Sequence, residues 1–103
     1  MKKTYRILFH PEAKKELLSL EGSLRIKVLK QIKKLKEKPQ LGENLGNKAG
    51  LDLTGYKKLY VDNKRIRIVY SIMEDMVLVY IISIAKRESM SAYRKAQKRK
   101  TDI

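Results

Sequence analysis

The 103-residue chain contains no cysteine and a single histidine, His10. Without cysteine it forms neither a disulfide nor a thiolate metal site, and one histidine does not build a histidine-rich metal centre. The longest uninterrupted apolar run, residues 76–82, is far shorter than the ~20 residues of a membrane-spanning helix. Charged residues interrupt the first ten positions, so no signal peptide is visible. We expect a cytoplasmic protein with no membrane contact.

Acidic residues are also scarce. Only 11 aspartates and glutamates stand against 25 lysines and arginines, which gives a formal net charge of +14. Such a field attracts phosphate polymers or acidic proteins, although a solvated basic surface is the plain alternative. With 43% hydrophobic residues the chain is globular, and its length predicts one domain over 1–103.

Apolar periodicity predicts an α+β fold, with helices packed on a sheet. The expected elements are a strand over 4–9, a helix from 11 that stops at 22, a second helix from 24 that ends before 38, a loop over 41–55, strands over 59–61, 65–72 and 77–85, and a helix over 88–100. Gly22 is expected to end the first helix in a left-handed conformation and Ser23 to cap the second. The strand over 77–85 is apolar on both faces and should be central, covered on both sides.

Several side chains in the second half of the chain are candidates for chemistry. Arg67 lies in the middle of an apolar strand, where arginine either caps the surface or binds an anion. Arg87 follows the central strand directly, at a junction with the next helix. Tyr93 either packs the last helix on the sheet or contacts a substrate base or phosphate. His10, at the start of the first helix, is interpreted as a cap or a surface group.

Three stretches show a resemblance to a known family. They read YRILFHPEAKKELLSL, GYKKLYVDNKRIRIVYSI and VLVYIISIAKRESMSAYRKAQKR. Together they cover nearly the whole chain and resemble the RelE branch of the RelE/ParE toxin superfamily. The resemblance implies a fold similar to that of a microbial ribonuclease, in the order β-α-α-β-β-β-α, with a mainly antiparallel four-stranded sheet against a helical hairpin. It also implies the toxin of a type II toxin–antitoxin pair, which cuts mRNA in the ribosomal A site without a metal or organic cofactor.

The resemblance assigns roles by position. Arg67 matches the arginine at the scissile phosphate, Arg87 the second arginine, which stabilises the leaving group and transition state, and Tyr93 the tyrosine that stacks on a substrate base. Lys58 matches the first of two hairpin lysines that act as general base and charge stabiliser. Further residues are expected to bind RNA: Lys57, Tyr60, Arg65, Lys86 and Arg94.

The chain departs from the family at the second hairpin lysine. Aligned from the turn, that lysine falls on Tyr60; aligned from Tyr56, Lys57 becomes the first lysine and Leu59 falls on the second. The general base is therefore Lys58, Lys57 or Tyr60. For Lys58 to accept a proton at pH 7 its pKa must be lowered, and nearby arginines are expected to do so.

Two other functions remain compatible with the fold. One is a ParE-like inhibitor of DNA gyrase, which needs no phosphodiester-cleaving site, and the other is an inactive basic module that binds nucleic acid. The family implies a cognate antitoxin as partner, in addition to the ribosome and mRNA. Operator DNA would be bound only through the antitoxin.

Overall fold

A sheet of five strands forms the centre of the molecule in the computed structural model, which describes residues 3–48, 50–86 and 91–99. Its strands are β1 (Arg6–Phe9), β2 (Glu43–Asn44), β5 (Tyr56–Val61), β6 (Ile66–Met73) and β7 (Leu78–Lys86). They lie in the order β1-β7-β6-β5-β2. Only the β1–β7 pair within this sheet is parallel, so the sheet is mainly antiparallel, as expected.

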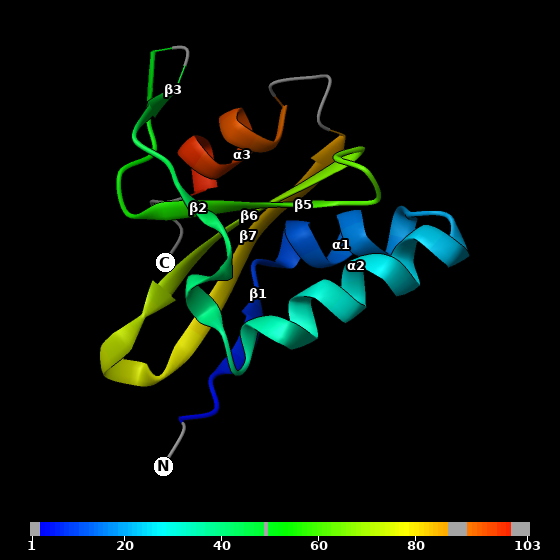
Figure 1. Cartoon of the computed structure of the whole chain (residues 1–103). Helices are drawn as coiled ribbons and strands as arrows, with labels where there is room; N and C mark the ends of the chain where they lie inside the picture. Colours follow the sequence, from blue (N-terminus) through cyan, green and yellow to red (C-terminus); the bar gives the residue numbers. More distant parts are fainter. Residues whose placement is uncertain (1–2, 49, 87–90, 100–103) are drawn as a thin grey trace.

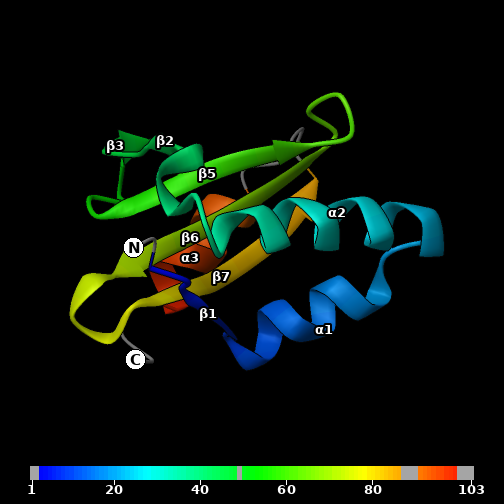
Figure 2. The same ribbon diagram turned by 60° about the horizontal axis from the view of Figure 1, so that its bottom comes forward.

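Helices cover both faces of this sheet (Figures 1 and 2). The helical hairpin, α1 (Pro11–Ser19) and α2 (Gly22–Leu35), packs on one face, and α3 (Ser91–Arg99) packs on the other. The order of the main elements is the predicted one. β7 lies between β1 and β6 and is buried from Leu78 to Ile84, which confirms the prediction of a central strand covered on both sides.

Strand alternation divides the core into two clusters, one on each face. Ile66, Ile68 and Tyr70 of β6 pack toward the helical hairpin, whereas Val69 packs toward α3. An irregularity between Val69 and Tyr70 in the β6–β7 ladder leaves one extra residue on β7. This extra residue shifts the alternation of β7. Each residue after the bulge therefore faces the side of the sheet opposite to the one that unbroken alternation predicts.

The segment predicted as a loop over 41–55 is partly ordered into short elements. It contains the end of a 3-10 turn, η1 (Pro39–Leu41), the edge strand β2 and a separate hairpin of β3 (Asn47–Lys48) and β4 (Leu51–Asp52). Two-residue strands are too short to show a periodicity, so the sequence gives no signal for them. Gly42 is needed here because a Cβ at this position would lie 2.5 Å from the Lys58 carbonyl oxygen.

The boundary between the two hairpin helices was also predicted incorrectly. Gly22 is the first residue of α2 and not a left-handed stop, and the N-cap is Glu21 rather than Ser23. The Glu21 carboxylate accepts hydrogen bonds from the backbone N–H groups of Ser23 and Leu24. A carboxylate at this end of a helix is also favoured by the helix dipole. Among the described residues, no helix is long and apolar enough to span a membrane.

Candidate active site

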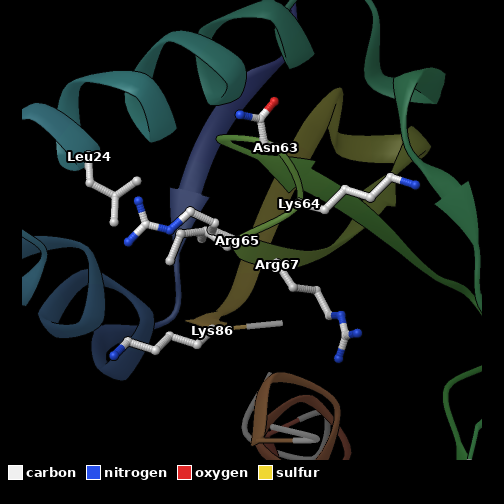
Figure 3. Close-up of a pocket in the computed structure, with 7 residues that line it drawn as sticks. Leu24, Asn63, Lys64, Arg65, Arg67 and Lys86 are labelled. Atoms are coloured by element: carbon white, nitrogen blue, oxygen red, sulfur yellow. The ribbon is translucent and has the colours of Figure 1, made fainter. Parts of the chain in front are cut away.

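Arg67 is a buried cation in the middle of the sheet. It lies on β6, and its side chain extends toward α3 (Figure 3). The residue is only 6% exposed, yet its Nε and Nη1 atoms have no hydrogen-bond partner among the described residues. Buried arginines normally satisfy their donors, because an unpaired buried donor costs ~1–3 kcal/mol. The two unpaired donors make Arg67 the candidate anion-binding residue of this site.

Tyr93, from α3, stacks on this arginine. The guanidinium carbon of Arg67 lies 4.0 Å from the centre of the Tyr93 ring, a cation–π contact. Tyr93 itself is 3% exposed and belongs to the apolar cluster beneath α3. The packing role of Tyr93 is therefore present in this structure, and its ring also fixes the position of Arg67. Stacking of Tyr93 on a substrate base stays a prediction.

Glu16 on α1 holds α3 in place. Its carboxylate accepts hydrogen bonds from Arg99 at 2.9 Å and from the backbone N–H of Ile84 at 3.1 Å, and it pairs with Lys95 at 2.6 Å. Burial raises the pKa of Glu16, but the hydrogen bonds from the two basic side chains and the backbone outweigh it and lower the pKa. Ser83 adds a second anchor, because its hydroxyl donates to the Ala92 carbonyl at 2.7 Å. Tyr93 thus has a rigid support.

Tyr60 stands directly opposite Arg67 in the β5–β6 ladder, and Lys58 stands opposite Val69 on the same face. The Lys58 Nζ atom lies 3.3 Å from the Tyr60 hydroxyl oxygen, and the Arg67 guanidinium carbon lies 5.6 Å from the Tyr60 ring centre. Lys58, Tyr60, Arg67 and Tyr93 therefore form one cluster, which we call the cationic–phenolic cluster. Three different elements supply it.

The electrostatics of this cluster contradict the expectation for Lys58. Burial lowers the pKa of Lys58, but its hydrogen bond to Tyr60 and the charges of Tyr93, Tyr60 and Glu43 outweigh that effect and raise it. The prediction of a lowered Lys58 pKa was wrong, because it counted the arginines and not the tyrosine at position 60. Tyr60 shows the opposite shift: burial raises its pKa, but hydrogen bonds and charges from Arg67 and Lys58 lower it to about 8.

The remaining candidates lie outside the cluster. The Lys57 side chain belongs to the opposite face of β5 and donates to Asn44 Oδ1 at 2.8 Å. Arg65 pairs with Asp62 in the β5–β6 turn at 3.1 Å. Lys86 ends β7 and points to the side of the helical hairpin, together with Arg65 (Figure 3). Arg94 is exposed on α3. Arg87 lies outside the described residues.

A pocket of about 480 Å³ opens at the end of the β5–β6 hairpin (Figure 3). Its lining is rich in basic residues and consists of Leu24, Asn63, Lys64, Arg65, Ile66, Arg67 and Lys86. No carboxylate is among these residues. The pocket therefore suits a polyanion such as an RNA backbone, which would enter beside the cationic–phenolic cluster.

His10 has a local structural role, as interpreted from the sequence. It is the N-cap of α1, where its Nδ1 accepts a hydrogen bond from the backbone N–H of Glu12 at 3.1 Å. The described part of the chain contains no group of three or more histidine, cysteine, aspartate or glutamate residues that could hold a metal ion.

Sequence reasoning missed Glu16 and Ser83. The signal for Glu16 was its place next to the apolar stripe of α1, since Ala13 and Leu17 are buried and a carboxylate beside them needs partners. Ser83 was the only polar residue within the apolar strand predicted over 77–85. Neither signal indicates which distant residue is the partner.

Comparison with known proteins identifies the fold and the family. No protein-family model matches the chain. The mRNA interferase toxin RelE of Escherichia coli K12 is 30% identical over 98 residues, which cover 92% of this chain and 96% of that protein. The structure of an arginine-to-alanine double mutant of E. coli toxin RelE in the free state superposes with a TM-score of 0.78 at 25% identity, over 94% of this chain and 98% of the other.

A more distant match shows the fold alone. The toxin in the intact E. coli RelBE toxin–antitoxin complex matches with a TM-score of 0.65 at 22% identity, over 82% of this chain and 99% of that one. The resemblance in the three sequence stretches is thus supported across nearly the full length of a curated relative. The chain belongs to the RelE toxin family.

Proposed function

We propose that this chain is the toxin of a type II toxin–antitoxin pair and an endoribonuclease that cuts mRNA in the ribosomal A site. The observation that carries the proposal is Arg67, whose buried guanidinium keeps two N–H donors unpaired among the described residues. Both atoms are covered in the free protein, so a phosphate would satisfy the two donors once the side chains around Arg67 move aside. The name of the E. coli relative, an mRNA interferase, supports the same reaction.

The reaction is a transesterification. The 2′-hydroxyl of one nucleotide attacks its own 3′ phosphate, and the products are a cyclic phosphate and a 5′-hydroxyl. Arg67 stabilises the extra negative charge that develops on the phosphate oxygens in the transition state. Tyr93 keeps the guanidinium in position from 4.0 Å away. Arg87 supplies a second positive charge in this proposal, on the strength of its match to the family position.

The ribosome supplies the substrate geometry in this proposal. In-line attack requires that the 2′-oxygen, phosphorus and 5′-oxygen lie close to one line, and positioning of that kind contributes orders of magnitude in rate. A flexible RNA strand rarely adopts this geometry, whereas an mRNA fixed in the A site does. We therefore expect slow cleavage of free RNA.

A cognate antitoxin is the proposed protein partner. The net charge of +14 favours an acidic segment, and the helical hairpin exposes apolar side chains at Leu18, Ile26 and Leu29. A segment that is acidic and amphipathic would cover both features. An E. coli toxin of this fold was solved in complex with its antitoxin, which supports this partner. Operator DNA would be bound through the antitoxin, and the toxin would act in the cytoplasm.

The test is induction of the chain alone, with growth recorded and mRNA 5′ ends mapped. The critical variant is Arg67→Met, and the matched control is Arg6→Met, which removes one exposed positive charge from β1. We expect growth arrest with cuts in the A site for the parent chain and the control, and neither effect for Arg67→Met.

Growth arrest without mRNA cuts would contradict the endonuclease. A gyrase supercoiling assay would then test the ParE-like alternative. No arrest, together with RNA affinity that falls steeply with salt, would indicate an inactive binding module.

A further inference from the structure

Tyr60 occupies the position from which a base would act. It faces Arg67 across the β5–β6 ladder, and its hydroxyl oxygen lies 3.3 Å from the Lys58 Nζ atom. Tyr60 is only partly buried, so a substrate held by Arg67 can reach its hydroxyl. The phenol oxygen is therefore next to the place where the phosphate, and with it the attacking ribose, would be bound.

The surroundings of Tyr60 favour its anionic form. From its own strand it faces Lys58, from β6 it faces Arg67, and the Lys64 Nζ atom of the turn lies 5.8 Å from its ring centre. Tyr93 of α3 is a phenol whose own pKa is raised, chiefly by burial, and which therefore stays neutral. Burial opposes ionisation of Tyr60, but the neighbouring cations lower its pKa to about 8. At pH 7 Tyr60 is then mainly a neutral phenol, with a minor fraction of phenolate.

Lys58 is poorly suited to accept a proton. Its pKa is raised because the hydrogen bond to Tyr60 and the nearby phenols outweigh burial. A lysine in this condition is a cation at neutral pH, and its positive charge stabilises the phenolate 3.3 Å away. In this arrangement Tyr60 is the residue that can accept a proton, and Lys58 lowers the pKa of Tyr60.

Resting on the proposed function, we propose that Tyr60 is the general base of the cleavage reaction and that Lys58 is its electrostatic partner. The Tyr60 phenolate takes the proton of the 2′-hydroxyl, and the 2′-oxygen forms its bond to phosphorus. The bond from phosphorus to the 5′-oxygen breaks, and that oxygen takes a proton from water. Tyr60 returns its proton to solvent before the next turnover, so that protons and charge balance.

The test is a pH profile of single-turnover cleavage of ribosome-bound mRNA by the purified protein. For the parent chain, we expect the rate to rise with pH through a midpoint near pH 8, as Tyr60 loses its proton. Tyr60→Phe keeps the ring but loses the hydroxyl, and should lower the rate by about 10²–10⁴-fold and remove the rise. The concentration of half-saturation should change little, because Arg67 still holds the phosphate.

A second variant separates Tyr60 from Lys58 as the base. Lys58→Met removes the cation that favours the phenolate, so the midpoint should move up toward the ordinary tyrosine value of 10.0, and alkaline pH should restore much of the rate. If Lys58 were the base, alkaline pH would restore nothing. Site-specific replacement of Tyr60 by 3,5-difluorotyrosine, a more acidic phenol, should move the midpoint down.

Tyr5→Phe is the matched control, since it removes a tyrosine hydroxyl just before β1, where that group donates to Glu74 at 2.7 Å. Its cleavage rate and profile should equal those of the parent chain. A Tyr60→Phe protein that remains folded and cleaves within about threefold of the parent rate, with the same profile, would overturn the assignment. So would a midpoint that difluorotyrosine leaves unmoved. A parent chain that cleaves no mRNA would instead refute the proposed endonuclease itself.

Discussion

Replacing Arg67 by methionine should make the free protein more stable while it abolishes activity. Two unpaired buried donors cost about 2–6 kcal/mol together, at ~1–3 kcal/mol each. Against this, the variant loses the contact at 4.0 Å with the Tyr93 ring, worth ~0.5–2 kcal/mol, and a hydrogen bond to Tyr60 worth ~1 kcal/mol. Methionine fills much of the volume with apolar atoms. The balance lies between a loss of about 1 and a gain of about 4.5 kcal/mol, and we expect a gain of about 2 kcal/mol.

The assay is chemical denaturation at pH 7 in a buffer of low ionic strength, followed by titration with sulfate. Sulfate that binds the native state alone should stabilise the parent chain by mass action, and the effect should be much smaller in Arg67→Met. Arg6→Met controls for the lost positive charge, because its side chain is exposed on β1. The reasoning fails if Arg67→Met is less stable than the parent chain, or if sulfate stabilises both variants equally.

Three further predictions concern the scaffold. Glu16→Gln should lower the free energy of unfolding at pH 7 by about 1–2 kcal/mol, because the ion pairs to α3 weaken. Folding lowers the pKa of Glu16, so its contribution to the free energy of unfolding is complete above the ordinary pKa of 4.5 and is lost as pH falls through the folded pKa. Denaturation of the parent chain at a series of pH values from 7 to 3 should show this loss of stability, and denaturation of the variant should not. Gly42→Ala should cost about 1–3 kcal/mol, since its Cβ meets the Lys58 carbonyl oxygen, whereas Gly46→Ala, with nothing within 4 Å, should cost far less in the same thermal melts. Ser83→Ala should cost about 1 kcal/mol, because the backbone carbonyl of α3 loses its donor, and an unchanged melting temperature would contradict that role.

The sequence predicted those parts of the fold that repeat over several residues. The strand over 65–72 and the central apolar strand have a period that one face of a sheet imposes, and both were found within one or two residues. The elements it missed depend on contacts between distant residues. β2 exists because the backbone of Glu43 lies opposite that of Lys58 in the β2–β5 ladder. The close approach at Gly42 is fixed by Tyr70, whose hydroxyl accepts a hydrogen bond from the Gly42 N–H at 2.9 Å. Local patterns hold no information about such pairs.

The site was predictable to a similar extent. Alternation along β5 places Lys58 with Arg67 and excludes Lys57 from that face, and the family match placed Tyr93 near them. The sequence could not show which way the Lys58 pKa would shift. That sign depends on whether the nearest group is another cation or a phenol, and only the 3.3 Å distance to Tyr60 decides it.

The departure at position 60 is compatible with catalysis for an electrostatic reason. A cation lowers the pKa of a neighbouring lysine by disfavouring its charged form, and it lowers the pKa of a neighbouring tyrosine by favouring its charged form. The ordinary pKa values of lysine and tyrosine both lie at about 10, so the same arginine and lysine lower the pKa of either side chain toward neutral pH. A second lysine in the hairpin and the tyrosine found here are thus two ways to obtain a base from one set of positive charges. The tyrosine has a further consequence in the proposed reaction: the phenolate that accepts the proton of the 2′-hydroxyl would partly offset the charges of Lys58 and Arg67, and its protonation would restore those charges as the phosphate becomes more negative.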